Sequence, residues 1–227
     1  MASKSNGNSI LDSLPYKEFG KISRDLESVP VAKDNAVFLA GRRNEYIYFP
    51  TGAVISFLGD TTGGGSIEVW SVGHEGVAGI AGLLGHSTPF PGVALVPGTA
   101  IRGKASVLRK HFEQSAAFHK AVLGYLQYLM TQVSYLGICN NSHPLDQRLS
   151  RWLLVMGERV GTSVLHFTQD SIAGVLGTRR ATISVAAAKL QADGLISYTP
   201  GAITIRSRRG LQKVACGCYK VINLKLR

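Results

Sequence analysis

The chain has 227 residues, of which 45% are hydrophobic and 17% are charged, and this composition is typical of a globular protein with a substantial core. No apolar run reaches the roughly 18 residues that a membrane-spanning helix needs, and the first residues lack the apolar stretch of a secretory signal. We therefore expect a cytoplasmic protein that makes no membrane contact. The formal net charge of +11 predicts an anionic partner.

The first predicted elements are one or two short helices in residues 9–29, which end before Pro30. From Val31 to about Lys110, short apolar or alternating runs are separated by Gly, Pro, Asn and Asp at a spacing of about ten residues. This pattern predicts an all-β unit, a sandwich or roll. Within it a glycine recurs at every third residue from Gly73 to Gly85, and we interpret this stretch as a tight segment packed in the roll.

Residues 112–140 contain no proline and predict a long helix. Apolar residues at alternating spacings of four and three form a coiled-coil seam in this helix, which predicts a parallel homodimer. A helix that faces the core of the β unit is the alternative interpretation. The residues of the predicted seam are Val122, Leu126, Leu129, Val133 and Leu136.

A polar break at residues 140–144, Asn-Asn-Ser-His-Pro, separates this helix from the rest of the chain. The next helix is predicted over residues 145–160. Its apolar side carries Leu149, Trp152, Leu153 and Met156.

Residues 168–196 predict two short helices joined by a tight turn. Thr168 can cap the first helix, and Gly177 can end it because glycine tolerates the left-handed backbone of such a turn. Thr178 can cap the second helix, residues 179–192. That helix would bury Ile183, Ala186, Ala187 and Leu190, and it would expose Arg179, Arg180, Thr182 and Ser184.

A β-hairpin with a Pro-Gly turn is predicted to follow over residues 195–205. Helix, turn, helix and a two-stranded wing together predict a winged helix-turn-helix, whose second helix enters the DNA major groove. An ordinary helical hairpin with a solvated basic end is the alternative. Charge favours DNA binding, because residues 141–227 hold 13 Lys and Arg against 4 Asp and Glu, whereas residues 1–140 hold 12 against 10.

The three cysteines, Cys139, Cys216 and Cys218, are sparse and odd in number, which favours a reducing compartment. Such cysteines are most often small buried core residues, although they could sense oxidants if they were exposed and activated. The six histidines show no metal-ligand spacing along the chain, and no nucleophile elbow or metalloprotease motif occurs. We therefore expect no metal, no cofactor and no catalytic residues.

The order of β-roll, long helix, hinge and winged helix-turn-helix resembles the CRP/FNR family of bacterial transcription regulators over nearly the whole chain. The resemblance is sharpest over residues 168–205, and residues 49–52 and 72–76 are similar to the β-roll of some members. It implies an α+β fold: an N-terminal β-roll, which is a cyclic-nucleotide-binding-like jelly roll, a long dimerisation helix and a C-terminal winged helix-turn-helix. The corresponding domains are a sensor-like domain (1–112), a dimerisation helix (113–140) and a DNA-binding domain (141–227).

The resemblance implies that an arginine in the first turn of the recognition helix reads guanine, and Arg180 matches that position. Two positions depart from better-known members: Ala181 replaces a glutamate and Val185 replaces a second reading arginine. The operator should therefore differ from the best-known family site. The full set of expected DNA contacts is Thr168, Gln169, Thr178, Arg179, Arg180, Thr182, Ser184, Lys189, Ser197 and Thr199.

The founding ligand of the family is a cyclic nucleotide, whose phosphate is held by an arginine in the roll. This chain has no Lys or Arg between Arg43 and Arg102, and residues 89–93 replace the arginine-bearing segment. We therefore expect that cyclic AMP is not the ligand, because a buried phosphodiester would lack a charged partner. Another small-molecule effector, or none, remains open. The expected effector pocket contains Gly73, His74, Glu75, Gly76 and Phe90.

The leading hypothesis is a dimeric, sequence-specific transcription regulator that binds a pseudo-palindromic operator in double-stranded DNA, with RNA polymerase as a candidate partner. An enzyme of the β-roll type with a helical appendage, metal-dependent or not, is the alternative. A non-specific nucleic-acid-binding or scaffold protein is a third interpretation, which predicts affinity that falls with salt but ignores sequence.

Overall fold

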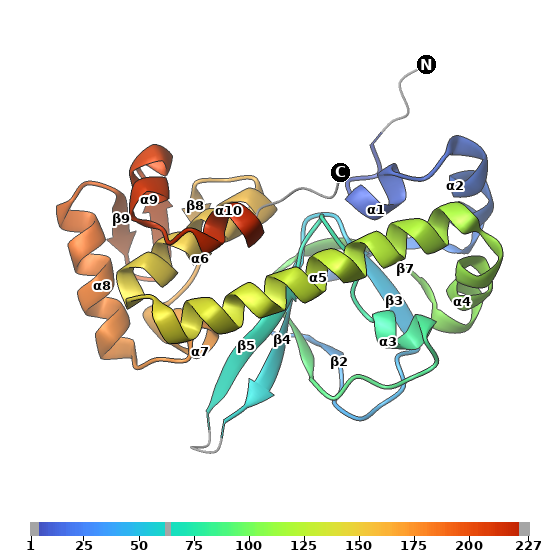
Figure 1. Cartoon of the computed structure of the whole chain (residues 1–227), viewed down its shortest axis with the longest axis horizontal. Coiled ribbons are helices and arrows are strands. Elements are labelled where there is room, and N and C mark those ends of the chain that lie inside the picture. The colour runs from blue at the N-terminus through green and yellow to red at the C-terminus, as the bar shows by residue number, and fades with distance from the viewer. Residues whose placement is uncertain (1–4, 62–64, 223–227) are drawn as a thin grey trace. The chain divides into compact units, whose positions relative to one another are not determined.

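A computed structural model describes residues 5–61 and 65–222 of the chain. These residues form two compact units. The first contains residues 5–58 and 71–129, and the second contains residues 59–61, 65–70 and 130–222. The helices and strands of both are labelled in Figure 1.

The chain begins with two short helices, α1 (Ser9–Asp12) and α2 (Tyr16–Ile22), and the 3-10 turn η1 (Ser23–Asp25). The helical prediction through residue 29 is wrong at its end, because strand β1 (Glu27–Val31) follows. Strand β1 contains Pro30 and lies at the edge of its sheet. Proline is tolerated on an edge strand, because one side of such a strand needs no hydrogen bonds to a neighbour.

Two antiparallel sheets form the predicted all-β unit, and their strand orders are β1-β7-β3 and β2-β6-β4-β5. The register of the first sheet pairs Pro30 with Thr99 and Phe49 with Ile101. Ile47 and Val54 are fully buried in the core. The remaining strands are β2 (Ala36–Phe38), β3 (Tyr46–Pro50), β4 (Val54–Asp60), β5 (Ser66–Val72), β6 (Gly92–Val96) and β7 (Gly98–Lys104).

The glycine-rich stretch packs tightly in the roll, as predicted, and includes the short helix α3 (Ile80–Leu83). A side chain at Gly76 would clash with the ring of Tyr125, since an ideal Cβ there lies 2.2 Å from that ring. Gly79 has a φ of 90°, which favours glycine. The close approach to Tyr125 explains why a small residue is needed at position 76.

The predicted long helix is interrupted near its start. Helix α4 (Ala105–Gln114) ends before Ser115, and α5 (Ala116–Ser142) then runs as one continuous helix (Figure 1). Ser115 has an extended backbone, and its hydroxyl oxygen accepts a hydrogen bond from the Phe118 N–H at 3.3 Å. Ser115 therefore acts as the cap of a new helix rather than as an interior residue.

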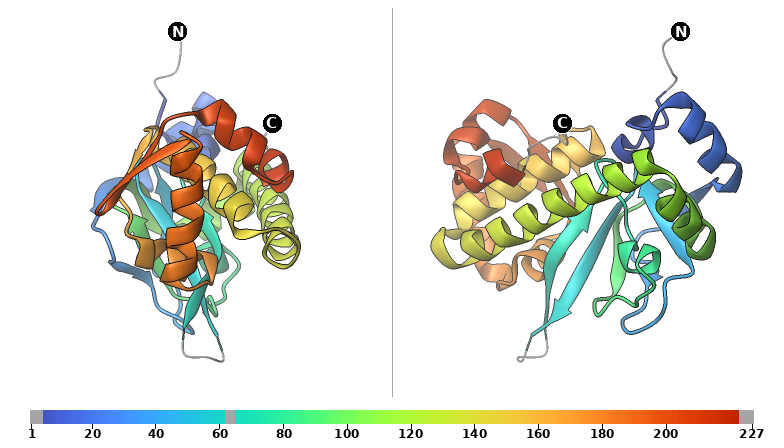
Figure 2. Two further views of the ribbon diagram at one scale, coloured as in Figure 1. Left: turned by 90° about the vertical axis from the view of Figure 1, so that its left-hand side faces the viewer. Right: turned by 45° about the vertical axis from the view of Figure 1, so that its right-hand side comes forward.

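The second unit contains the predicted helix α6 (Leu145–Val160), whose observed bounds match the prediction. Leu149, Trp152, Leu153 and Met156 are all buried, as predicted. The other elements of this unit are β8 (Val164–Leu165), α7 (Gln169–Leu176), α8 (Arg180–Ala192), β9 (Ile196–Thr199), β10 (Ala202–Ile205), α9 (Arg208–Val214) and α10 (Cys218–Ile222). Figure 2 shows α8 beside the wing hairpin of β9 and β10.

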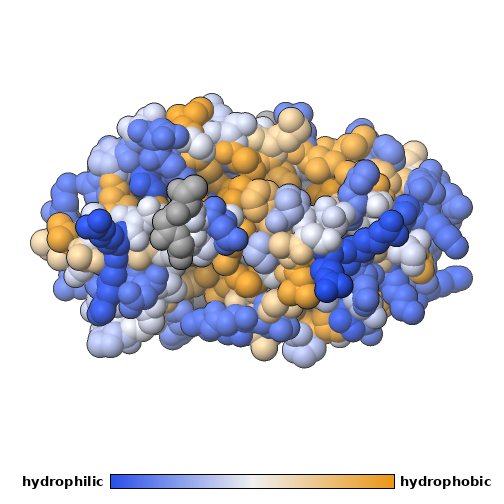
Figure 3. Space-filling view, turned by 90° about the horizontal axis from the view of Figure 1, so that it is seen from below, coloured by the Kyte–Doolittle hydropathy of each residue, from blue (hydrophilic) through white to orange (hydrophobic). Residues whose placement is uncertain are grey.

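In the described ranges, none of the helices has the length and apolarity that crossing a bilayer requires. Several large apolar side chains are nevertheless exposed, including Leu123, Met130 and Val185. Figure 3 shows one face of the molecule, on which apolar residues lie among hydrophilic ones. Exposed apolar side chains that cluster on one element mark surfaces where a partner can bind.

Candidate nucleic-acid interface

The turn between α7 and α8 forms as the sequence predicts. The Thr168 hydroxyl oxygen accepts a hydrogen bond from the Ser171 N–H at 3.1 Å and so caps α7. Gly177 ends α7 with a φ of 59°, in the left-handed region. Both observations confirm the predicted roles, and they explain how α7 can stop sharply at Gly177 before α8 begins.

The start of α8 differs by one residue from the prediction. Arg179 has an extended backbone and occupies the cap position without a side-chain hydrogen bond. The prediction that Thr178 caps this helix is therefore wrong. The helix begins at Arg180, because the backbone carbonyl of Arg179 already accepts the N–H of Thr182 at 3.0 Å. Arg180 thus stands in the first turn of the helix.

Helix α8 has one buried face and one exposed face. Ile183, Ala186, Ala187 and Leu190 are buried, as predicted. The residues on the opposite face recur at spacings of about four, so they form one strip along the helix. The exposed strip contains Arg180, Ala181, Ser184, Val185 and Ala188.

Arg180 lies near one carboxylate, with 3.6 Å between its Nε and Asp170 Oδ2. Both side chains are mostly exposed, so the pair is screened by water and contributes little to stability. The guanidinium group can leave Asp170 at small cost and pair with another acceptor. This freedom suits an arginine that binds phosphate or guanine.

Lys189 has a closer partner than Arg180. Its ammonium group donates to Asp146 Oδ2 at 2.6 Å. This hydrogen bond holds the pKa of the Asp146 carboxyl below its usual value, and it raises the pKa of Lys189. The predicted DNA contact of Lys189 stays a prediction, and its ammonium group would have to leave Asp146 to make it.

The predicted wing is a hairpin of β9 and β10, to which β8 adds a third strand. Its Pro-Gly turn is accommodated because Gly201 has a φ of 82°. The Tyr198 N–H donates to Gln191 Oε1 at 2.8 Å, which ties the wing to α8. Sequence analysis missed one cation here: Arg206 is exposed, and its Nε donates to Ser197 Oγ at 3.2 Å.

All ten expected DNA contacts lie in the second unit. Thr168 and Gln169 stand at the start of α7, and Ser197 and Thr199 are on β9. Thr178 and Arg179 precede α8, and the others lie along it. Seven of the ten side chains are exposed and three, Gln169, Thr178 and Ser197, are half-buried. Their roles in DNA binding stay predictions.

The expected effector residues are largely committed to contacts within the roll. Glu75 Oε1 accepts a hydrogen bond from the Gly73 N–H at 3.1 Å, and the His74 carbonyl accepts one from the Ser9 N–H at 2.8 Å. Gly76 lies against the ring of Tyr125. Phe90 is half-buried, and its carbonyl accepts a hydrogen bond from the Thr88 hydroxyl at 3.2 Å. Their role as a pocket stays a prediction.

A cavity of about 420 Å³ in the first unit is lined by none of these five residues. It is lined instead by Arg43, Lys104 and Arg109, together with Glu45 and other residues. Arg109 reaches the glycine-rich stretch, because its Nη2 donates to the Gly82 carbonyl at 2.8 Å. The absence of cations between Arg43 and Arg102 in the sequence therefore does not mean that this part of the roll lacks them.

The predicted dimer seam is wrong at its first and last positions. Val122 is fully buried in its own chain, beside Phe118 and Tyr125 along α5, so it cannot contact a partner. Leu136 is also buried. The exposed apolar residues of the helix are shifted by one position. Leu123 is 48% exposed and Met130 is 66% exposed, whereas Leu126, Leu129 and Val133 are half-buried.

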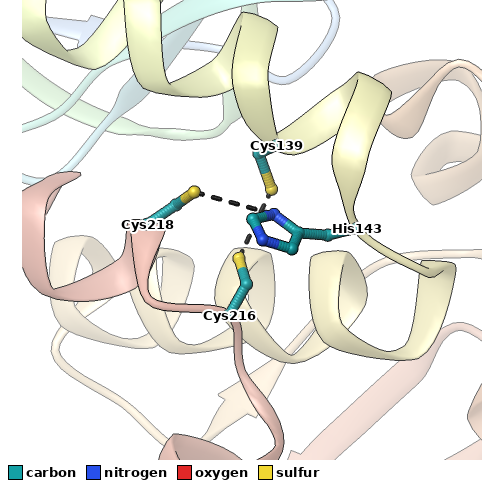
Figure 4. A group of neighbouring side chains, drawn as sticks. All are labelled: Cys139, His143, Cys216 and Cys218. Atoms are coloured by element: carbon teal, nitrogen blue, oxygen red, sulfur yellow. Dashed lines mark hydrogen bonds between the residues drawn. The ribbon is translucent and has the colours of Figure 1, made fainter.

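Four potential metal ligands come together in three dimensions, although the sequence shows no metal-ligand spacing, and the expectation of no metal stays a prediction. Cys139, His143, Cys216 and Cys218 come together within the second unit, and their ligand atoms all lie within 4.8 Å of one another (Figure 4). The three thiols are buried, and burial, followed by a hydrogen bond with Cys139, raises the pKa of Cys216 to about 12. The thiols therefore do not meet the condition of exposure and activation that oxidant sensing needs.

Residues 147–214 match the family described as the Crp-like helix-turn-helix domain. The chain also resembles solved structures of regulators with this architecture. FixK2 from Bradyrhizobium japonicum superimposes with a TM-score of 0.73 at 16% sequence identity, covering 85% of this chain and 98% of that one. A CRP-family transcriptional regulator from Thermus thermophilus has a TM-score of 0.70 at 16% identity, with coverages of 83% and 96%.

A third similar structure is CLP from Xanthomonas campestris, described as a c-di-GMP-responsive global regulator. It has a TM-score of 0.68 at 14% identity and covers 85% of this chain and 100% of its own. No curated protein matches the chain by sequence. The chain thus carries a Crp-like helix-turn-helix domain and has the fold of the CRP/FNR family of transcriptional regulators, which confirms the resemblance seen in its sequence.

Proposed function

We propose that this chain is a transcription regulator that binds specific sites in double-stranded DNA as a homodimer. The observation that carries the proposal is the exposed strip of α8, which begins with Arg180 in the first turn. A helix of this kind, preceded by a bracing helix and followed by a wing, presents its N-terminal side chains to base edges in the major groove. The excess of Lys and Arg in residues 141–227 supplies phosphate attraction.

Arg180 is proposed to read guanine, because its fork of donors matches the O6 and N7 acceptors of that base. Val185 adds a second contact that sequence analysis missed. It is 72% exposed and stands on the same strip as Arg180, where a large apolar side chain has no structural role to fill. An apolar side chain in the major groove contacts the thymine methyl group. We therefore expect a guanine and a thymine in each operator half-site.

Dimerisation is proposed through the exposed face of α5 rather than through the seam predicted from sequence. Leu123, Leu126, Met130 and Val133 follow one another at spacings of three, four and three, as in a coiled coil. All four are exposed or half-buried in the single chain. Two chains paired along this face would present two recognition helices, and the operator would then be pseudo-palindromic.

The effector is proposed not to be cyclic AMP. Residues 44–101, which contain the expected pocket, carry no cation to pair with its phosphate. The nearby cations Arg43, Lys104 and Arg109 line a different cavity from the expected pocket residues. Saturable binding of cyclic AMP at micromolar concentration in calorimetry would contradict this part of the proposal.

The central test selects binding sites from random duplex DNA with the full chain and with Arg180→Ala. We expect the wild-type protein to enrich a pseudo-palindromic motif, and the variant to lose about 1–3 kcal/mol of discrimination at one base pair of each half-site. Arg209→Ala is the matched control, because Arg209 is also exposed but lies on α9. Retained selectivity in Arg180→Ala would contradict the assignment, and salt-dependent binding without any motif would favour a non-specific protein.

A further inference from the structure

We propose that Cys139, His143, Cys216 and Cys218 bind one Zn²⁺ ion, which links the C-terminal end of α5 to the turn that leads into α10. The site belongs entirely to the second unit, and it does not depend on whether the chain binds DNA. Figure 4 shows the three thiols around the imidazole ring of His143.

The distances between the four ligands fit a single ion. Cys139 Sγ lies 3.5 Å from Cys216 Sγ, and Cys218 Sγ lies 3.7 Å from His143 Nδ1. In a tetrahedral zinc site with zinc–sulfur bonds of about 2.3 Å, neighbouring sulfur atoms are about 3.8 Å apart. No pair of ligand atoms is more than 4.8 Å apart, so the group is too tight to enclose an iron–sulfur cluster.

The types of ligand select the ion and its role. Three cysteines and one histidine are among the usual ligand sets of structural zinc, whereas calcium and magnesium prefer oxygen ligands. Four protein ligands leave no open position for water or substrate, so the ion would be structural rather than catalytic. On binding, each of the three thiols transfers its proton to solvent and the resulting thiolate coordinates the ion.

The local backbone places the ligands in two pairs. Cys139 and His143 are four residues apart, and the His143 N–H donates to the Cys139 carbonyl at 3.2 Å, so both side chains lie on one side of a helical turn. Cys216 and Cys218 flank Gly217, and the Tyr219 N–H donates to the Cys216 carbonyl at 3.0 Å in the turn that starts α10. Each pair is therefore held by backbone hydrogen bonds before any ion arrives.

A buried cation beside the cluster gives independent support. Arg151 is only 4% exposed, and no carboxylate in the described ranges forms an ion pair with it. Its Nε donates to Cys139 Sγ at 3.3 Å. A buried guanidinium group needs a counter-charge, and a neutral thiol supplies none. Zn²⁺ with three thiolates and a neutral imidazole has one net negative charge, which Arg151 would balance.

The site would fix the hinge of the second unit. His143 lies between the end of α5 and the start of α6, whereas Cys216 and Cys218 belong to the C-terminal segment. One ion would cross-link segments that are far apart in sequence. Such a cross-link restricts the unfolded and partly opened states more than one between residues close in sequence. The helix that carries the proposed dimer face would then be joined firmly to α6.

The test measures metal in the full-length chain, expressed with zinc in the medium and purified without a histidine tag or chelator. We expect about one zinc per chain by elemental analysis, and three free thiols after denaturation in a chelator. Replacing zinc by Co²⁺ should produce the intense visible bands of a tetrahedral site and sulfur-to-cobalt charge transfer in the near ultraviolet. A chelator should lower the unfolding temperature of the wild-type protein.

Two variants remove single ligands: Cys218→Ser and His143→Ala. Both are expected to lose most of the zinc and the response of the unfolding temperature to chelator. His166→Ala is the matched control, since His166 is exposed in the same unit and outside the cluster, and it should retain one zinc per chain. If neither ligand variant folds, the cobalt spectrum of the wild-type protein decides whether a tetrahedral site with sulfur ligands is present.

Three results would overturn the proposal. The first is wild-type protein without zinc, or with cobalt bands typical of an octahedral oxygen site. The second is iron with acid-labile sulfide in place of zinc, which would assign a cluster. The third is a Cys139–Cys216 disulfide in the protein purified under reducing conditions, because the thiols would then be unavailable as ligands.

Discussion

Single side chains on α8 have different surroundings, and these decide what each can contribute. Arg180 pairs loosely with Asp170, so it is free to bind a base. Lys189 is hydrogen-bonded to Asp146 and therefore stabilises the domain as it stands. Val185 is apolar and exposed, so its contribution should appear only when DNA is bound.

Val185→Ser should reduce the preference for thymine at one position of each half-site without changing the fold. Removal of an apolar contact with a methyl group costs about 1 kcal/mol, which corresponds to about a fivefold loss of discrimination. Competition binding with operators that carry thymine or uracil at that position measures the effect, because uracil lacks only the methyl group. An unchanged ratio of the two affinities would place Val185 away from that base.

Asp146→Asn should make the domain less stable at neutral pH. It should also remove the part of the pH dependence of stability that comes from the Asp146 carboxyl. The pKa of Asp146 is lowered, chiefly by the hydrogen bond from Lys189, so its stabilising effect is complete above the ordinary pKa of aspartate. The effect is lost as the pH falls through the lowered pKa. Because Lys189 is exposed, the difference at pH 7 should be at most about 1 kcal/mol.

Denaturant unfolding of the wild-type protein and of Asp146→Asn, followed from pH 7 to pH 2, measures that difference. The two stabilities should converge only at acid pH. A difference that stays constant over the whole range would mean that Asp146 acts by packing rather than by charge.

At the level of elements, the turn between α7 and α8 depends on a single backbone conformation. Gly177→Ala should lower the stability of the protein by about 1–2 kcal/mol, because alanine disfavours the left-handed region that Gly177 occupies. Gly174→Ala is the matched control. Gly174 lies inside α7 with open space around it, so alanine there should raise stability by up to about 1 kcal/mol.

Chemical denaturation of both glycine variants measures the free energy of unfolding, which should fall in Gly177→Ala and rise in Gly174→Ala. Equal effects of the two substitutions would mean that the turn does not hold Gly177 in the left-handed conformation.

Helix α5 has two apolar faces with different partners. One face, with Val122 and Tyr125, is buried in its own chain. The other, with Leu123 and Met130, is exposed and is proposed to pair with a second copy. Met130→Glu should therefore give a monomer at micromolar concentration, because two such helices would bring like charges into an apolar seam.

Analytical ultracentrifugation measures the oligomeric state of Met130→Glu. Gln114→Glu provides the same final side chain at an exposed position of α4, and it should remain a dimer. A dimer of unchanged strength in Met130→Glu would show that the chain pairs through another surface. A monomeric wild-type protein would show that the chain does not pair at all.

At the level of the whole molecule, the proposed zinc ion should connect stability to DNA binding. The protein without metal should bind its operator about tenfold more weakly, since the hinge at residues 140–144 would be less restricted. Cys218→Ser should show the weaker binding with or without a chelator. Fluorescence anisotropy with labelled operator measures both. Equal operator affinities of the zinc-loaded and zinc-free wild-type protein would show that the metal site does not affect DNA binding.

Patterns along the chain were enough to predict the elements on either side of the DNA-binding turn. The bounds of α6, the cap at Thr168, the left-handed Gly177 and the buried face of α8 all follow from local rules. These rules concern residues close in sequence, and the backbone hydrogen bonds they describe are local. Three local predictions nevertheless failed. Arg179 rather than Thr178 occupies the cap position of α8. Strand β1 replaces the end of a helix because it pairs with the distant β7, and Ser115 caps a new helix.

Composition and periodicity were enough to predict the all-β unit, the position of the turn and the basic character of residues 141–227. Long-range packing determines which face of α5 is free and which cations line the cavity of the roll, and no pattern along the chain reveals either. The same packing brings Cys139 and His143 to Cys216 and Cys218. Contacts between residues far apart in sequence leave no periodic signal, so the grouping of these four ligands appears only after the chain has folded.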